Sequence, residues 1–305
     1  MKRQLLGVAA ILLSISTYAQ DNPLWMRYCA ISPDGTTIAF TYKGDIYTVP
    51  STGGRASQIT TNPAHDTKPI WSPDGKKIAF ASDRMGSMDI FEVNKEGGIP
   101  KRLTTHSGNE TPVAYKDAGH ILFLANIMPT VEDAQFPSGQ FQQVYEVNTE
   151  GGRPALFSSM PMEDISINHT GNTLLYHDKK GYEDPWRKHH TSSITRDIWL
   201  CSLNGNRTFR KQTTFNGEDR TPVWASDDKS FYYLSEEKGS FNIFKRDIDG
   251  NTSKQITNHT KHPVRFLSAA SNGTLCYGYD GEIYTVKELS LIHISEPTRL
   301  RCISY

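Results

Sequence analysis

Apolar and polar positions alternate in short runs along most of the chain, and these runs recur as one repeated unit. Residues 30–35 read AISPDG and precede TIAF at 37–40, while residues 70–75 read IWSPDG and precede KIAF at 77–80. In such a turn proline presets φ, aspartate accepts hydrogen bonds from nearby amides, and glycine accepts a positive φ. The pattern therefore predicts two β-strands that are joined by a tight turn.

The same turn returns in four weaker copies, so the chain contains six units. The copies are KDAG at 116–119, NHTG at 168–171, SDDK at 226–229 and SNG at 271–273. Each unit also carries a polar, a β-branched and an aromatic residue in succession, which favours a strand. These triplets are DIY at 45–47, DIF at 89–91, QVY at 143–145, DIW at 197–199, NIF at 242–244 and EIY at 282–284.

A third marker, a Gly- or Asn-containing turn followed by a short strand, closes most units, as in QIT at 58–60 and 255–257. Four short antiparallel strands per unit follow from the three markers. A repeat of this kind indicates a propeller or a solenoid, and six radial sheets leave few exposed edges. A β-sandwich would not repeat three markers in the same order. We predict an all-β six-bladed β-propeller of WD40-like repeats, in one domain over residues 20–287.

Two insertions break the regular spacing and are expected to form surface loops. The first spans 129–142, and the second spans 178–196 and contains Trp186, Arg187, Lys188, His189 and His190. Adjacent histidines alone cannot fill a metal site. The residue types favour either a docking loop for another domain or an anionic peptide end, or a solvated loop that Trp186 fixes.

His262 and Arg265 stand where the inner strand of the sixth unit should begin. They are candidates for the lining of a channel mouth, and an ordinary hydrogen-bonded histidine fits position 262 equally well. The GxSxG, HExxH, GxGxxG and Walker patterns do not occur, and these patterns mark serine hydrolases, zinc peptidases and nucleotide-binding proteins. We predict no catalytic residue, no metal and no cofactor in this chain.

The charge balance bears on the class of binding partner, and the cysteine spacing bears on disulfide bonds. Lys+Arg and Asp+Glu both number 33, so the net charge is zero and nothing favours a nucleic-acid or anionic-membrane partner. Cys29, Cys201, Cys276 and Cys302 form no CxxC pair. The first three lie in apolar runs, so we expect buried core residues and no disulfide framework.

The two ends of the chain differ in character from the repeats. Residues 1–19 combine Lys2 and Arg3, an apolar run over 5–15 and a small-x-small site that ends at Ala19. They predict a cleaved signal peptide and an exported protein, periplasmic or extracellular, without a membrane span. Residues 289–299 read LSLIHISEPTR, which matches codon by codon the translation of a transposase-type sequencing adapter. We therefore expect 288–305 to be a non-native read-through tail, the sixth blade to be incomplete and the parent protein to be longer.

The three markers together resemble the propeller repeats of tricorn-type proteases, of the Tol-system periplasmic protein and of the prolyl oligopeptidase group. The segments PLWMRY at 23–28, WRKHH at 186–190 and HPVRFL at 262–267 are most similar to exported tricorn-like peptidases of Bacteroidetes-type bacteria. The resemblance covers about 20–287.

The tricorn resemblance implies a first propeller that precedes a second propeller, a PDZ domain and a serine peptidase domain. None of the family's catalytic residues maps onto this chain, so the fragment is expected to be inactive. The propeller would guide or gate peptides, its partners would be peptides and the downstream domains, and a homo-oligomer is compatible with it. The alternatives are a free-standing Tol-type binding propeller and the propeller of a prolyl oligopeptidase-like enzyme.

Overall fold

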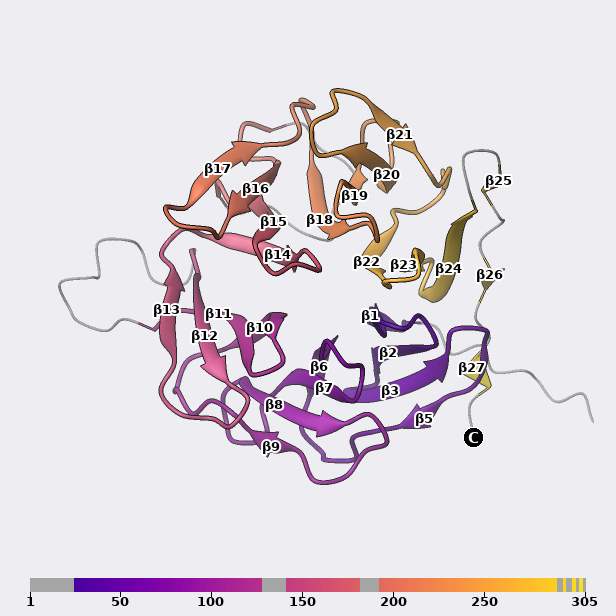
Figure 1. Ribbon diagram of the computed structural model, residues 1–305. Helices are drawn as coiled ribbons and strands as arrows, with labels where there is room; N and C mark the ends of the chain where they lie inside the picture. Colours follow the sequence, from indigo (N-terminus) through magenta and orange to yellow (C-terminus); the bar gives the residue numbers. More distant parts are fainter. Residues whose placement is uncertain are drawn as a thin grey trace, which may run out of the picture.

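Six antiparallel sheets stand around a central axis in this computed structural model (Figure 1). The structure describes residues 25–127, 141–181 and 192–289, together with the two-residue strands β25 (His293–Ile294), β26 (Thr298–Arg299) and β27 (Cys302–Ile303). Every regular element among these residues is a β-strand. The predicted all-β, six-bladed propeller is confirmed.

Each of the first three blades is built from consecutive strands that pair in chain order. Blade one contains β1 (Arg27–Ile31), β2 (Thr37–Tyr42), β3 (Asp45–Pro50) and β5 (Ser57–Gln58), and β4 (Gly54–Arg55) pairs with β27. Blade two contains β6 (Asp66–Trp71), β7 (Lys77–Ser82), β8 (Asp89–Asn94) and β9 (Lys101–Arg102). Blade three contains β10 (Thr111–Asp117), β11 (His120–Ala125), β12 (Gln143–Asn148) and β13 (Ala155–Ser158).

The other three blades follow the same order. Blade four contains β14 (Met162–Ile167), β15 (Thr173–Asp178), β16 (Ile198–Ser202) and β17 (Thr208–Lys211). Blade five contains β18 (Asp219–Trp224), β19 (Ser230–Ser235), β20 (Asn242–Asp247) and β21 (Ser253–Gln255). Blade six contains β22 (Arg265–Ala269), β23 (Thr274–Tyr279) and β24 (Glu282–Leu289).

Hydrogen bonds explain why the three sequence markers repeat together. In the first turn, Asp34 accepts from the Ser32 hydroxyl at 2.6 Å and from the Thr36 amide at 3.0 Å. The second turn repeats both bonds around Asp74. The amide of the β-branched residue in the second marker donates to the threonine hydroxyl of the third marker in four blades, at Ile46–Thr60, Ile90–Thr104, Ile198–Thr213 and Ile243–Thr257.

The hydrophobic core is divided among the six junctions between neighbouring blades, with one apolar cluster at each. In β7, for example, Ile78 and Phe80 face blade one, while Ala79 between them faces blade three. Successive side chains of a strand point to opposite faces, so a buried strand such as β7 serves two junctions. The predicted stacking of alternating blade faces is confirmed.

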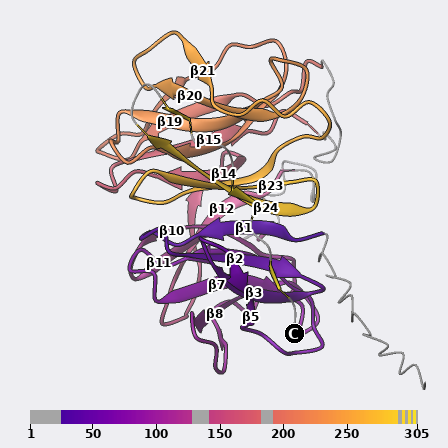
Figure 2. The same ribbon diagram turned by 90° about the vertical axis from the view of Figure 1, so that its right-hand side faces the viewer.

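Among the described strands, no blade sheet is shared between the first and last blades, and the one strand pairing between the segment after blade six and blade one is β27 with β4. Each inner strand lies against the next, and β22 lies against β1; the side view shows β1 beside β23 (Figure 2). Backbone hydrogen bonds cross this junction from Met26 N to Gly281 O at 3.1 Å and from Ser271 N to Pro33 O at 2.9 Å. Apolar packing and a few polar contacts therefore hold the two ends of the propeller together.

The outer position of blade six differs from the expectation. β26 pairs with Tyr284 and Thr285 of β24, in the place that β9 takes beside Phe91 and Glu92 in blade two. The repeat region supplies β22, β23 and β24 to this blade. The fourth position is filled by two residues, Thr298 and Arg299, of the segment 288–305.

Two smaller expectations concern cysteines and membrane spans. Cys29, Cys201 and Cys276 are free and buried, as predicted for core residues. In the part of the chain that the structure describes, no helix is long and apolar enough to cross a membrane.

Candidate functional site: the lining of the central channel

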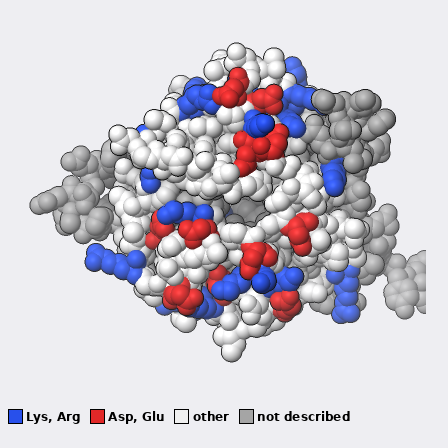
Figure 3. Space-filling view, in the orientation of Figure 1, with Lys and Arg blue, Asp and Glu red and all other residues white. Residues whose placement is uncertain are grey.

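The inner strands of the blades surround a hollow at the centre of the ring, where acidic and basic side chains are interspersed on the surrounding face (Figure 3). Five of these strands carry a β-bulge at the same place, marked by a shift of register between its two flanking pairs. The first bulge residue has a positive φ of 50–56° in all five: Tyr28, Lys68, Asp164, Thr221 and Phe266. We call these five residues the collar.

A non-glycine residue with positive φ is strained by roughly 1 kcal/mol or more, and such strain persists only where the surrounding structure enforces it. A bulge also turns a side chain away from the direction that the strand alternation would give it. In blade three the bulge falls at Val113, whose side chain packs on the apolar core beside blade four. The collar therefore comes from five blades of the six.

The collar side chains contact their neighbours around the ring. The rings of Tyr28 and Phe266 lie 4.8 Å apart between centroids, and the Lys68 ammonium lies 5.8 Å from the centre of the Tyr28 ring. On the other side, the Thr221 hydroxyl donates to Asp164 Oδ2 at 2.6 Å. Blades one and four are opposite each other in the ring, yet Asp164 contributes to the raised pKa of Tyr28. The collar therefore forms a partly continuous rim around the channel, with Asp164 facing the charged and aromatic side chains of blades one and two.

Two collar side chains, Tyr28 and Lys68, have shifted pKa values because they are buried beside charged groups. Burial raises the pKa of Tyr28, Arg27 opposes this rise and Asp164 adds to it. Burial also lowers the pKa of Lys68, an effect that the carboxylates of Asp164 and Glu163 only partly oppose. Lys68 is thus a half-buried cation against an aromatic ring, a place where an anionic group would relieve the cost of its lost hydration.

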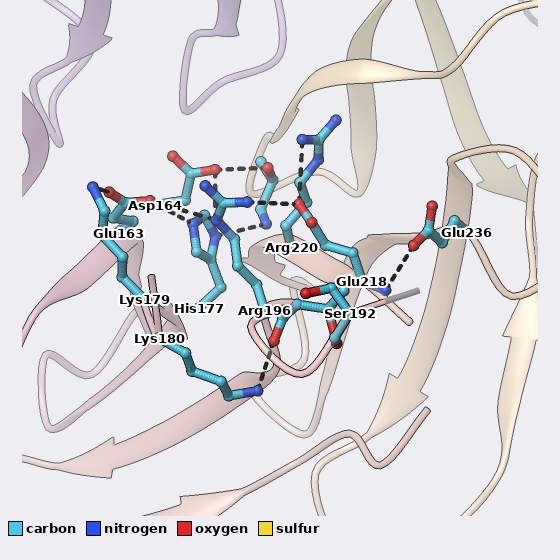
Figure 4. A network of polar contacts seen from close by, with 12 residues as sticks. Glu163, Asp164, His177, Lys179, Lys180, Ser192, Arg196, Glu218, Arg220 and Glu236 are labelled. Atoms are coloured by element: carbon cyan, nitrogen blue, oxygen red, sulfur yellow. Dashed lines mark hydrogen bonds and ion pairs between the residues drawn. The ribbon is translucent and has the colours of Figure 1, made fainter. Parts of the chain in front are cut away.

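Beside the collar, a polar network lines the wall between blades four and five (Figure 4). The Thr221 amide donates to His177 Nδ1 at 3.2 Å, so the ring proton is assigned to Nε2, which lies 3.2 Å from Glu163 Oε2. Lys179 donates to the other oxygen of Glu163 at 2.8 Å. Burial works against ionisation of Glu163, but His177 and Lys179 outweigh it and hold its pKa well below the ordinary value.

Deeper in the same wall, one carboxylate holds two guanidinium groups. Glu218 Oε1 accepts from Arg196 at 2.9 Å and lies 3.4 Å from Arg220 NH1. Arg220 also lies 4.0 Å from the centre of the Phe241 ring, and burial lowers its pKa to about 10. All three charged side chains are nearly inaccessible to solvent. They fix the wall on which Asp164 and Thr221 stand.

The sequence-predicted site residues are only partly placed by the structure. Trp186, Arg187, Lys188, His189 and His190 lie outside the described residues. His262 lies on the loop before β22, with Nε2 3.2 Å from Asp280 Oδ1. Arg265 begins β22 immediately before the collar residue Phe266 and lies close enough to Arg220 to lower its pKa. Among the described residues, no cluster of three metal-ligating side chains occurs.

Sequence reasoning missed the collar, although a positional signal was present. Each collar residue stands four positions before the residue that opens the turn of its blade; these turn residues are Ser32, Ser72, Asn168, Ala225 and Ala270. The five residues share no chemical type, so their common position carries no visible motif. Aligning the six turns and reading backwards would have identified them.

Fold and site together define a six-bladed propeller that is closed by packing and lined at its centre by mixed polar and aromatic side chains. The chain belongs to the family described as the tricorn protease N-terminal β-propeller domain, whose family model matches residues 23–290. The predicted kinship with tricorn-type proteases is confirmed.

Individual relatives agree with the family. Tricorn protease homolog 1 of Streptomyces coelicolor is 26% identical over 280 residues, covering 91% of this chain and 25% of that protein. The crystal structure of the tricorn protease matches with a TM-score of 0.72 at 21% identity, over 87% of this chain and 25% of that one. TolB from Acinetobacter baumannii shares the fold, with a TM-score of 0.62 at 14% identity over 86% of this chain and 60% of that one. The chain spans about a quarter of the length of the curated relatives it matches.

Proposed function

We propose that this propeller is the non-catalytic front part of a secreted, tricorn-like serine peptidase, and that its channel guides or gates peptides on their way to or from the catalytic domain. The collar is the observation that carries the proposal. Family membership supports the peptidase context, because the relatives that match are named tricorn proteases and are about four times as long. The likeness to TolB extends to the fold alone and adds no second function.

The collar suits an extended peptide better than a folded protein or a small apolar ligand. Its side chains contact one another from blade to blade around the channel, so they form an inner rim that a thin chain could follow. Tyr28 and Phe266 offer aromatic surface to side chains, while Lys68 and Asp164 offer one charge of each sign. A peptide with a free carboxylate can pair with Lys68, and its backbone amides can donate to Asp164.

Replacing Lys68 by Met tests this role, since methionine keeps most of the side-chain length and removes the charge. Loss of one charge-assisted contact should weaken binding of a labelled, free-carboxylate hexapeptide by about tenfold, as measured by fluorescence anisotropy. The C-terminally amidated peptide should bind both proteins alike. Lys76→Met is the matched control, because Lys76 belongs to the same blade but is exposed on its turn. Equal affinities in wild type and both variants would contradict a peptide site at the collar.

The parent gene supplies an independent test of the peptidase context. Resequencing past codon 287 should reveal a reading frame that continues into further domains with a serine peptidase. A stop codon within about one strand length of that position would leave a free-standing binding propeller. A following α/β-hydrolase with GxSxG would instead assign the chain to the prolyl oligopeptidase group.

Export is the second part of the proposal. When the full chain is expressed in a Gram-negative host, the protein should be recovered from the periplasm with an N-terminus near Gln20. Deleting residues 2–19 should retain it in the cytoplasm. Cell fractionation with N-terminal sequencing measures both, and an uncleaved Met1 on periplasmic or membrane-bound protein would contradict a cleaved signal.

A further inference from the structure

The junction between blades one and six is the place where the propeller is held only by non-covalent contacts. No blade sheet among the described strands spans it; one apolar cluster and a few hydrogen bonds join the two blades, and β27 of the C-terminal segment pairs with β4. Two cysteines lie in this cluster, Cys29 from the inner strand β1 and Cys276 from β23. Opening of the ring would separate these two residues, which stand far apart in the sequence.

Contacts of both residues converge on one spot. The Cys29 thiol donates to Phe266 O at 3.3 Å, and the Cys29 carbonyl lies 3.5 Å from Ser268 Oγ. Ser268 is the cross-strand partner of Cys276. Cys29 and Cys276 belong to the same buried cluster, and Cys29 is near enough to add to the raised pKa of the Cys276 thiol. Both side chains are buried, with 4% and 0% of their surface exposed.

We propose that Cys29 and Cys276 are the two halves of a disulfide latch that fastens the last blade of the propeller to the first. The reaction is thiol–disulfide exchange with an external disulfide, such as oxidised glutathione or a dithiol oxidase of an oxidising compartment. One thiolate attacks the external disulfide and releases a thiol, and the second thiolate then displaces the remaining half. Two cysteine thiols lose two electrons and two protons, and the external disulfide becomes two thiols.

Because both thiols are buried in the closed ring, the disulfide has to form during folding. Burial and the contact with Cys29 raise the pKa of Cys276 well above its ordinary value, and the thiolate is the species that attacks a disulfide. In the closed ring the exchange is therefore slow. The latch forms while blade six docks on blade one during folding, and afterwards it resists reduction because both sulfurs are out of reach of solvent.

Oxidative refolding tests the latch, in a Cys302→Ser background that removes the fourth thiol. The protein is unfolded in urea under reductant and refolded with a glutathione redox buffer or with reductant only. The oxidised protein should lose about 2 Da and yield a peptide pair linked through Cys29 and Cys276. Its melting temperature should exceed that of the reduced protein by about 5–10 °C, since the bond closes a very long loop.

Cys201→Ala is the matched control, because Cys201 is equally buried but lies in β16 of blade four. This variant should keep the redox-dependent melting shift, whereas Cys29→Ala and Cys276→Ala should both lose it while melting like the reduced parent. Three thiols that survive oxidative refolding would overturn the proposal. Linkage through Cys201, or an equal melting temperature in both buffers, would overturn it as well. None of these outcomes depends on peptide binding at the collar.

Discussion

Replacing Glu218 by Gln is expected to lower the free energy of unfolding by about 3–5 kcal/mol, the usual cost of breaking a buried ion pair from one side. Glu218 is fully buried and is the carboxylate that Arg196 and Arg220 share. Without its charge, two guanidinium groups that are each about 8% exposed would face each other in a wall with little water. The repulsion is strongest there because the surroundings screen it weakly.

Urea denaturation followed by circular dichroism measures this effect, and the denaturation midpoint should fall while the slope is unchanged. Glu237→Gln is the matched control. Glu237 follows the same blade's second strand, but its side chain is 39% exposed and pairs with the exposed Lys238 at 3.4 Å, so its loss should change stability by less than about 0.5 kcal/mol. A change below about 1 kcal/mol in Glu218→Gln would mean that water reaches the two arginines and that the wall is not rigid.

The second large effect concerns pH and the junction between blades two and three. Glu110 is fully buried, and neither of its oxygens has a hydrogen-bond partner in good geometry among the described residues. Burial raises the pKa of Glu110 from 4.5 to about 7; the Asp89 carboxylate adds to the rise, and Thr104 and Arg102 oppose it. The folded state therefore binds this proton more tightly than the unfolded chain does.

The sign of the pH effect follows from this difference. Below pH 4.5 the Glu110 carboxyl is protonated in both the folded and the unfolded state. The folded protein then has the full stability that the protonated Glu110 allows. As the pH rises through about 7 the folded protein must accept a buried negative charge, and stability falls by about 3 kcal/mol in total. Glu110→Gln carries no proton to lose. The free energy of unfolding of Glu110→Gln should match that of wild type near pH 4 and exceed it by about 3 kcal/mol at pH 8.

Stability differences between variant and wild type, measured by urea denaturation from pH 4 to pH 9, isolate this group from all others. Asp219→Asn should behave similarly, because burial also raises the pKa of Asp219 to about 7. Glu96→Gln, at a side chain that is 73% exposed, should give a difference that is flat with pH. A flat difference for Glu110→Gln too would show that Glu110 ionises normally and that water enters the junction.

The blades could be read from the chain because their signals are local. A Ser-Pro-Asp-Gly turn makes its hydrogen bonds within five residues, and the second and third markers are joined over only about fifteen. Such short-range bonds depend on residue types that must recur wherever the blade recurs. The alternating apolar residues likewise reveal two buried faces per strand, which only stacked blades can cover.

The collar and the buried charges could not be read in the same way. Glu218 and Arg220 look like ordinary surface residues beside a turn, and Tyr28 and Phe266 look like core aromatics. Their roles depend on partners far away in sequence, such as Phe266 for Tyr28 and Asp164 for Thr221. The docking residues are predicted from residue type alone, which carries no information on their position in space. Of these residues, His262 and Arg265 lie in the described part of the structure.

The sequence by itself determined the unit, its number and the order of its strands, since each depends on contacts within about one blade. Tertiary structure alone decided what stands on the axis. A bulge turns one residue of an inner strand out of the alternation that the sequence predicts, and ring closure then brings five such residues together. The same closure places Cys29 beside Cys276, because the two ends of the chain meet only when all six blades are in place.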